Sequence, residues 1–204
     1  MMSKEKQLLT AIVLAGGQSS RMGQDKALLT MRKQSLLSYV CNVAQESVNW
    51  VYIVTPWVEK YRNIVDLSSV YWVQEILVDP ETKSNCPLIG FYQGLEIVKT
   101  EWVLLLACDL PRLNSDEITR WCATLKDVPP EAIALLPRHA KGWEPLCGFY
   151  RTNCRSSIQD YLERGGRSFQ HWLQENTVME LAVRDRSILF NCNTPQDWAK
   201  LLLD

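Results

Sequence analysis

Apolar residues recur along this chain with two alternating periods, one typical of strands and the other of helices. Between Ser35 and Ala44 the apolar positions share one face of a helix, which predicts an amphipathic helix. From Glu101 to Cys108 the apolar residues are nearly continuous, as in a parallel strand buried on both faces. Further strands are predicted over Ala11–Leu14, Val51–Val54, Val70–Val73, Ala132–Leu136, Pro145–Tyr150 and Val178–Val183.

Helical segments separate these predicted strands. Asn114 predicts a helix start, because Glu117 follows it three residues later as in a capping box. Thr194 followed by Pro195 predicts the start of a C-terminal helix. The remaining helices are predicted over Trp57–Val65, Leu88–Val98, Asn153–Arg164 and Ser168–Gln174. The alternation predicts an α/β fold, a three-layer α/β/α sandwich with a mostly parallel, Rossmann-like sheet.

Length and composition favour one domain over residues 1–204 and exclude several classes of protein. A net charge of −1 gives no general attraction to nucleic acid or membranes. No apolar run reaches transmembrane length, and the polar residues 1–7 do not read as a signal peptide. The seven cysteines form no C-x-x-C pair, which favours a reduced, cytoplasmic protein. His139 and His171 lack metal-ligand spacing to a cysteine, which disfavours a zinc site.

The segment from Leu14 to Lys26 has the composition of a phosphate-binding loop. It follows a predicted strand, and Gly16 and Gly17 let backbone N–H groups approach an anion. Arg21 offers a planar fork for phosphate oxygens, and Lys26 offers a mobile positive charge. The spacing matches neither the P-loop nor the dinucleotide-binding pattern. The alternative interpretation is a strand-to-loop turn that carries exposed cations.

Two aspartates follow predicted strands. Asp109 ends the central strand, and open α/β sheets bind ligands beyond the carboxyl ends of their strands. At that position it would face the phosphate loop. Mg²⁺ is usually bound by one or two carboxylates, with phosphate oxygens and waters as its other ligands. Asp109 is therefore a candidate magnesium ligand, the alternative being a turn residue before Leu110 and Pro111. Asp79, which precedes Pro80, is by itself more typical of a turn than of a ligand.

Four segments resemble motifs of one family. Leu14–Lys26 is similar to L-A-G-G-x-S-x-R-M-G-x-D-K, the signature loop of nucleotidyltransferases that activate a phosphorylated acceptor. Pro87–Gly90 resembles P-L-x-G, Cys108–Pro111 resembles C-D-x-P, and Asn191–Pro195 resembles N-x-N-T-P. The segments span nearly the whole chain in the family's order. Together they are similar to the molybdenum cofactor guanylyltransferases, and the C-terminal asparagine motif narrows the resemblance to that family.

The resemblance implies that the chain transfers GMP from GTP to the phosphate of molybdenum-molybdopterin and releases pyrophosphate. It implies Mg²⁺ as cofactor with Asp109 as its ligand, and catalytic roles for Arg21, Lys26 and Asp109. It also implies partner proteins that deliver and receive the cofactor. The implied nucleotide-binding residues are Leu14, Ala15, Gly16, Gly17, Lys26, Asp79 and Asp109.

The C-terminal half is expected to bind the acceptor. Asn191 and Asn193 carry amides that suit hydrogen bonds to a pterin, although a turn that leads into the last helix explains them equally well. Arg167 follows two glycines and suits the acceptor phosphate. A surface charge at a helix start explains Arg167 equally well.

Departures from the family pattern bear on the choice of base and leave other functions open. Nucleotidyl transfer is implied more firmly than guanine preference, so cytidylyl transfer to the cofactor and sugar-phosphate activation are alternatives. A non-catalytic nucleotide-binding or delivery protein is a third, which the combination of phosphate-binding cations and a strand-end aspartate disfavours. The departures are Thr55, Cys86, Ile89 and Glu144, where Asn, Gly, Ala and His or Gln are frequent in the family.

Overall fold

A single mixed sheet forms the middle of the molecule. The computed structural model describes residues 8–17, 22–31, 33–63, 70–79, 85–140 and 142–201. Within these residues the sheet has seven strands in the order β11-β7-β10-β6-β1-β4-β5. The strands are β1 (Thr10–Leu14), β4 (Trp50–Thr55), β5 (Val70–Gln74), β6 (Trp102–Ala107), β7 (Ala134–Leu136), β10 (Cys147–Arg151) and β11 (Val178–Glu180).

Most neighbouring strands in this sheet are parallel, which confirms the prediction. β1 pairs in parallel with β4 and β6, β4 pairs in parallel with β5, and β11 pairs in parallel with β7. Of the described strands of this sheet, β10 alone runs antiparallel to its neighbours, β6 and β7. The register places Leu14, at the end of β1, opposite both Val54 and Ala107. The carboxyl ends of three central strands therefore meet at one edge of the sheet.

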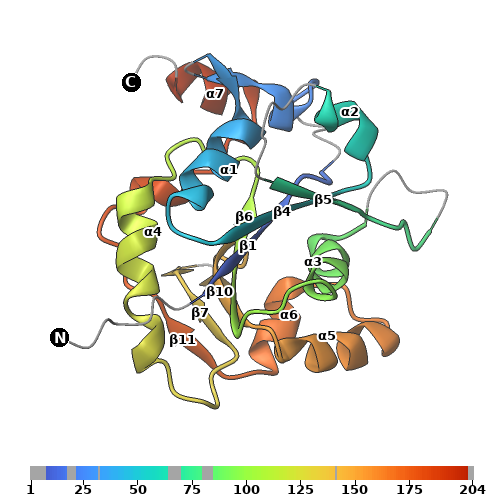
Figure 1. The fold of residues 1–204 in the computed structure, drawn as a ribbon, viewed down its shortest axis with the longest axis vertical. Coiled ribbons are helices and arrows are strands. Elements are labelled where there is room, and N and C mark those ends of the chain that lie inside the picture. Colours follow the sequence, from blue (N-terminus) through green and yellow to red (C-terminus); the bar gives the residue numbers. More distant parts are fainter. Residues whose placement is uncertain are drawn as a thin grey trace.

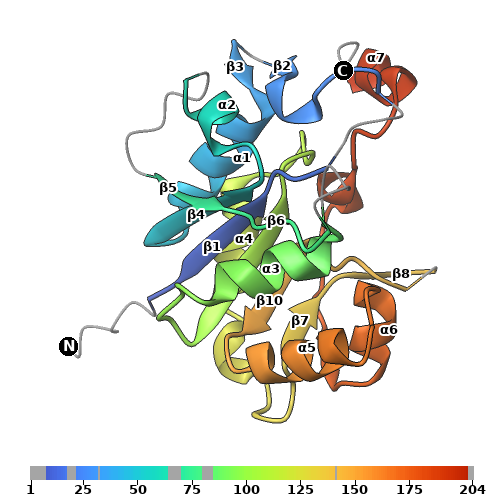
Figure 2. The same cartoon turned by 90° about the vertical axis from the view of Figure 1, so that its right-hand side faces the viewer.

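Helices cover both faces of the sheet, so the predicted three-layer arrangement is also confirmed (Figures 1 and 2). On one face lie α1 (Leu36–Gln45) and α4 (Ser115–Cys122). On the other lie α3 (Pro87–Leu95), α5 (Cys154–Glu163) and α6 (Phe169–Gln174). β1 divides its side chains accordingly. Ala11 and Val13 join the core under α1 and α4, whereas Ile12 joins the core under α3, α5 and α6.

Side-chain caps explain where three of the helices begin. Ser35 accepts a hydrogen bond from the Ser38 N–H at the start of α1. At the start of α6, Ser168 accepts from the His171 N–H. Asn114 caps α4 by accepting from the N–H of Glu117, as the sequence predicts. These caps satisfy backbone donors that the first helical turn leaves unpaired.

Short elements near the sheet edge escape prediction from sequence. β2 (Thr30–Met31) and β3 (Gln34–Ser35) form one hairpin, and β8 (Arg138–His139) and β9 (Gly142–Trp143) form another. Strands of two residues have too few positions to show alternation. The predicted helix over 57–65 is α2 (Val58–Arg62), and its last two residues lie outside the described chain. The predicted strand over 178–183 ends three residues early, at Glu180.

The C-terminal segment returns to the N-terminal half of the chain. α7 (Pro195–Leu201) follows a short 3-10 turn, η3 (Arg186–Leu189). Trp198 and Leu201 pack on a small cluster that includes Met22, Met31 and Cys192. Figure 2 shows α7 close to the N-terminal hairpin, far along the chain from it. This packing brings the C-terminal asparagine motif beside the phosphate loop.

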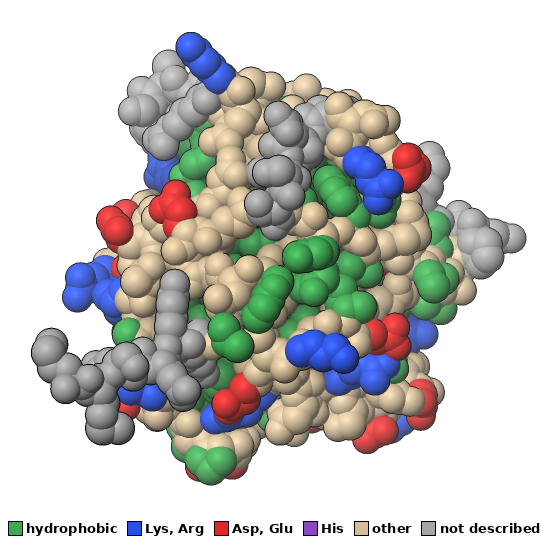
Figure 3. All heavy atoms as spheres, in the orientation of Figure 1, with side chains coloured by type: hydrophobic (Ala, Val, Ile, Leu, Met, Phe, Trp, Pro, Cys, Tyr) green, Lys and Arg blue, Asp and Glu red, His purple; other side chains and the backbone are tan. Residues whose placement is uncertain are grey.

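The surface carries no dominant charge on the face that Figure 3 shows, where acidic and basic side chains lie scattered around an apolar area near its middle. This agrees with the net charge of −1. No helix among the described residues is long and apolar enough to cross a membrane. All seven cysteines lie in the described part of the chain as free thiols.

Candidate nucleotide and phosphate site

The order of the strands creates one position where a ligand is expected. From β1 the chain builds outward through β4 and β5, and it then crosses to β6 on the other side of β1. Loops leaving β1 and β6 therefore diverge to opposite sides. Open α/β sheets bind ligands at such a switch point, beyond the carboxyl ends of the strands.

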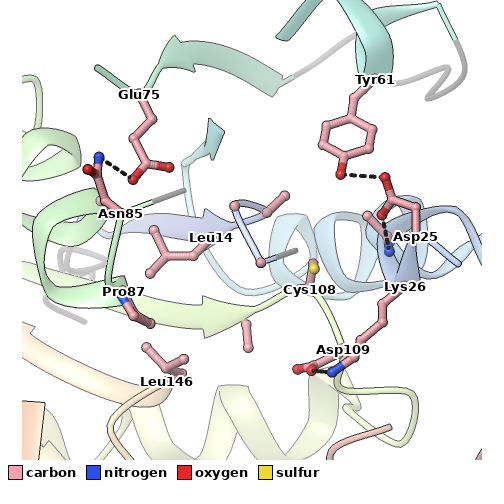
Figure 4. Close-up of a pocket in the computed structure, with 16 residues that line it drawn as sticks. Leu14, Asp25, Lys26, Tyr61, Glu75, Asn85, Pro87, Cys108, Asp109 and Leu146 are labelled. Carbon is pink, nitrogen blue, oxygen red and sulfur yellow. Dashed lines mark hydrogen bonds and ion pairs between the residues drawn. The ribbon is translucent and has the colours of Figure 1, made fainter. Parts of the chain in front are cut away.

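A pocket occupies this position (Figure 4). Glu75 and Asn85 lie at one end, Lys26 and Asp109 lie at the opposite end, and Leu14 lies between them. The pocket thus has Glu75 at one end and two carboxylates, Asp25 and Asp109, at the other. Its described lining consists of Leu14, Ala15, Gly16, Gly17, Asp25, Lys26, Ala27, Tyr61, Glu75, Asn85, Pro87, Gly90, Ala107, Cys108, Asp109 and Leu146.

The loop after β1 is fixed at its base. The Ala15 N–H donates to the Val54 carbonyl at 3.0 Å, and the Thr55 hydroxyl donates to the Ala15 carbonyl at 2.8 Å. Thr55, which differs from the Asn frequent in the family, is fully buried, and its hydroxyl holds the base of the loop. Beyond this point, no described residue accepts from the backbone N–H groups of Gly16 and Gly17. These groups are therefore available to an anion.

Lys26 joins three distant parts of the chain. Its Nζ lies 3.1 Å from Oδ2 of Asp109 and 2.6 Å from Oδ1 of Asn193. The side chains of Lys26 and Asp109 are only 14% and 17% exposed. A partly buried ion pair is screened less by water than a surface pair. The structure therefore holds one cation between two oxygen ligands at the phosphate end of the pocket.

Asp25 positions the backbone that carries Lys26. Its carboxylate caps the 3-10 turn η1 (Lys26–Leu28) by accepting from the Ala27 N–H at 3.0 Å. The same carboxylate accepts from the Tyr61 hydroxyl at 2.8 Å and from Lys60 at 2.5 Å. Burial, followed by the hydrogen bond to Asp25, raises the pKa of Tyr61, so its hydroxyl remains a donor. The sequence does not single out Asp25 as a residue that positions Lys26, although it directly precedes Lys26.

Asp109 is held at the end of β6 by the C-terminal segment. The Cys192 N–H donates to the Asp109 carbonyl at 3.1 Å, and the Cys108 N–H donates to the Leu14 carbonyl at 3.2 Å. Burial is the main cause that raises the pKa of the Cys108 thiol, which keeps it a poor metal ligand. The atoms suited to a cation here are carboxylate and amide oxygens, which match the preference of Mg²⁺. The described residues contain no group of three or more His, Cys, Asp or Glu side chains arranged to hold a metal ion by themselves.

A second carboxylate, Glu144, lies near Asp109. Burial, with the charge of Asp109 as the next cause, raises the pKa of Glu144, and a hydrogen bond from Asn191 opposes this. Nε2 of His139 lies 3.7 Å from Oε2 of Glu144. The structure thus brings Asn191 and Asn193 to the same end of the site. Asn193 contacts Lys26 and Asn191 contacts Glu144.

Glu75 forms the other end of the pocket. It follows β5 and is only 5% exposed. Its Oε1 accepts from Nδ2 of Asn85 at 2.9 Å. Burial raises the pKa of Glu75, and the hydrogen bond from Asn85 partly offsets this. Glu75 lies two residues after the strand predicted over Val70–Val73, so the strand-end rule that selected Asp109 was a usable signal for it.

Among the described residues, Asp79, Arg167, Asn191 and Asn193 are predicted site residues that do not line the pocket itself. Arg21 lies outside the described residues. Asp79 is exposed, beyond the exposed Ile76 and Val78, and its nucleotide contact stays a prediction. Arg167 is exposed, and its Nη1 donates to the backbone carbonyls of two neighbouring residues, at 3.0 Å and 2.6 Å. Its role toward an acceptor also stays a prediction.

The fold and the site define a class: a nucleotidyltransferase with a glycine-rich phosphate loop facing a lysine–aspartate pair at the switch point of its sheet. Residues 11–178 match the model of the MobA-like NTP transferase domain. The sequence is 57% identical over 191 residues to a probable molybdenum cofactor guanylyltransferase from Trichormus variabilis, covering 94% of this chain and 89% of that protein.

A second relative, from Synechococcus elongatus, has the same description and is 40% identical over 95% of this chain and 97% of that protein. The chain therefore belongs to the molybdenum cofactor guanylyltransferases within the MobA-like NTP transferase family, which confirms the resemblance drawn from sequence. Its fold matches molybdopterin-guanine dinucleotide biosynthesis protein A from Archaeoglobus fulgidus with a TM-score of 0.75, at 18% identity, over 94% of this chain and 95% of that one.

Proposed function

We propose that this nucleotidyltransferase transfers GMP from GTP to the phosphate of molybdenum-molybdopterin and releases pyrophosphate. The observation that carries the proposal is the contact of Lys26 with both Asp109 and Asn193. It joins the phosphate loop, the end of the central strand and the C-terminal asparagine motif in one place. A donor phosphate and an acceptor phosphate would meet there.

The proposed reaction needs charge stabilisation more than proton transfer. An oxygen of the acceptor phosphate attacks the α-phosphorus, and the bond from the α-phosphorus to the bridging oxygen of pyrophosphate breaks. The acceptor oxygen is already an anion, so no strong base is required. The N–H groups of Gly16 and Gly17 hold phosphate oxygens, and Lys26 offsets charge that develops on the transferring group. Positioning of the two phosphates supplies the remainder.

Mg²⁺ is part of this proposal. Asp109 would hold the ion together with phosphate oxygens and water, and Glu144 is the nearby second carboxylate. When bound, the ion supplies further positive charge at the phosphates. Asp109 also orients the Lys26 ammonium, because the two side chains are in direct contact.

In this proposal the acceptor binds on the side of the C-terminal asparagine motif. Asn191 and Asn193 carry amides beside Lys26 and Glu144, where they can bind the pterin or its phosphate. Proteins that supply and receive the cofactor belong to the proposal as partners. We also propose a cytoplasmic location, because seven free cysteines suit a reducing compartment.

A pyrophosphate-release assay tests this function. The purified chain is incubated with molybdenum-molybdopterin and each of the four nucleoside triphosphates, with Mg²⁺ or with EDTA. We expect release with GTP only, dependent on the acceptor and on Mg²⁺. Release with CTP instead of GTP would assign a different base. Absence of release with all four would overturn nucleotidyl transfer to this acceptor.

A further inference from the structure

The C-terminal segment over residues 191–194 brings an amide oxygen to the phosphate end of the pocket. Oδ1 of Asn193 lies 2.6 Å from Nζ of Lys26, on an ammonium that Asp109 also contacts at 3.1 Å. Asn193 belongs to no helix or strand, so regular secondary structure does not fix its backbone. Its side chain can hold Lys26 in one place only if other contacts supply the missing order.

Asp197 supplies such contacts from the first turn of α7. One oxygen of its carboxylate, Oδ2, accepts from the Asn193 N–H at 3.1 Å and from the Thr194 N–H at 2.9 Å. In return, the Thr194 hydroxyl oxygen accepts from the Asp197 N–H at 3.1 Å. This arrangement is a reciprocal capping box that reaches one residue further back, to Asn193. The carboxylate therefore fixes the residue that contacts Lys26 as well as capping the helix.

The preceding residue is fixed in a different way. The Cys192 side chain is fully buried in the small cluster on which Trp198 packs. The Cys192 N–H donates to the Asp109 carbonyl at 3.1 Å. Figure 2 shows α7 beside the N-terminal hairpin, where this packing takes place. Asn193 is thus held by the core on one side and by Asp197 on the other, and its amide keeps one direction toward Lys26.

Asp197 itself lies outside the pocket lining given by the described residues. The hydrogen bond from the Thr194 side chain is the main cause that lowers the pKa of Asp197. At neutral pH the carboxylate is therefore ionised, and it can only accept hydrogen bonds. Its effect on the pocket would have to pass through Asn193.

We propose that Asp197 is a positioning residue of the transfer reaction: it fixes the backbone of Asn193, whose amide oxygen then orients the Lys26 ammonium toward the transferring phosphate. The inference rests on the proposed function for the reaction, whereas the contacts of Asp197 and Asn193 need no substrate. Orientation is valuable here, because a misplacement of about 1 Å can cost about 10²-fold in rate.

Steady-state kinetics of pyrophosphate release test the proposal first. Asp197→Ala should lower kcat about 10-fold with the KM for GTP nearly unchanged, because Lys26 is present but less well oriented. Asp197→Asn should stay within about twofold of the unaltered protein, since one oxygen accepts both N–H groups and the amide retains one. An Asp197→Asn variant as slow as Asp197→Ala would overturn the proposal.

A double-mutant cycle shows whether Asp197 acts through the Asn193 side chain. Asn193→Ala alone should lower kcat about 10-fold or more, and adding Asp197→Ala should lower it no further. The loss of thermal stability from the missing cap should appear in both backgrounds, because the cap does not involve the Asn193 side chain. Losses of kcat that multiply would show that Asp197 acts independently, against the proposal.

Ser168→Ala is the matched control for the loss of a helix cap. Ser168 accepts from the His171 N–H at the start of α6 and does not line the pocket. This variant should lower Tm as Asp197→Ala does while leaving kcat unchanged. Equal losses of kcat in the two variants would assign the effect of Asp197 to stability alone and overturn its positioning role.

A measurement without substrates separates this inference from the transfer reaction. The Lys26 ammonium is hydrogen-bonded and its side chain is 14% exposed, so NMR should detect it as a slowly exchanging signal, assigned by its loss in Lys26→Arg. The signal should persist in Asp197→Asn and disappear in Asp197→Ala. A signal that Asp197→Ala leaves unchanged would overturn the inference, whether or not transfer occurs. The expected signals in a protein that releases no pyrophosphate would remove the transfer reaction and keep Asp197 as the residue that orients Lys26.

Discussion

Asp109 and Glu75 carry the same functional group and both lie just beyond the carboxyl end of a strand, yet their surroundings differ. Asp109 lies two residues after β6, Glu75 follows β5, and these strands lie on opposite sides of β1. Asp109 contacts the Lys26 ammonium. Glu75 contacts the neutral amide of Asn85 and is buried more deeply. The partner decides the role: a cation makes one carboxylate part of an electrostatic site for phosphates, and an amide leaves the other as a directional acceptor.

The largest effect is expected from removing the cation at the phosphate end. Lys26→Ala should lower kcat about 10²–10³-fold, because a group that stabilises developing charge contributes about 2.7–4 kcal/mol to the transition state. Steady-state pyrophosphate release measures this. Lys126→Ala, on the exposed turn after α4, serves as the control and should have no effect. Full turnover in Lys26→Ala would remove the phosphate end from the catalytic account.

Asp109→Asn tests the other member of that pair. The amide keeps the shape but loses the charge that orients Lys26 and suits a cation. We expect the half-maximal Mg²⁺ concentration to rise in a titration of initial rates, with an unchanged circular dichroism spectrum. An unchanged Mg²⁺ titration would show that the metal is held elsewhere.

Glu117 offers a third carboxylate, with a role in stability alone. It accepts from Arg120, from the indole of Trp121 at 3.2 Å and from the N–H of Arg184 at 3.0 Å. The Arg120 hydrogen bond is the main cause that lowers the pKa of Glu117 to about 2. Glu117→Gln should destabilise the fold by about 2 kcal/mol near neutral pH.

The pH dependence of this loss has a definite sign. A carboxylate whose folded pKa is lowered contributes its full stability above its unfolded pKa of about 4.3. That contribution disappears as the pH falls toward 2, where the folded group also takes a proton. Urea denaturation at several pH values should therefore show the two proteins converging in acid. A difference in stability that stays constant down to pH 2 would contradict this.

The smallest effect is expected at the support beneath Lys26. Tyr61→Phe removes one hydrogen bond to Asp25, which retains its contacts to Ala27 and Lys60. We expect a loss of about 1 kcal/mol in stability and a reduction of kcat of a few-fold. Thermal unfolding and pyrophosphate release measure the two quantities. A loss as large as that of Lys26→Ala would mean that Tyr61 contacts the nucleotide directly.

The sequence predicts the phosphate end of the site far better than the end that Glu75 forms. Gly16 and Asp109 lie just after strands with clear apolar runs, so the strand-end rule locates them, and Lys26 is found by the glycine-rich loop that it closes. Glu75 also follows a strand, but its burial depends on Gly16 and Gly90, which approach it only in the folded chain. The sequence instead indicates Asp79 as the nucleotide-binding carboxylate in this region, and the structure places Asp79 on the surface.

Contacts between distant segments explain the other omissions. Asp25 is adjacent to a predicted residue, but its partner Tyr61 lies on a different helix. Asn193 reaches Lys26 because the C-terminal segment packs on the N-terminal hairpin region, which no local periodicity shows. The layers and the order of the elements follow from local patterns, whereas these contacts follow from tertiary packing.

The most direct test of the account is a crystal structure with GTP and Mg²⁺. The account predicts the phosphates beside Gly16, Gly17 and Lys26, within hydrogen-bond distance of the Lys26 ammonium, and Mg²⁺ on Asp109. A nucleotide bound in the reverse direction, with its phosphates at the Glu75 end of the pocket, would contradict it.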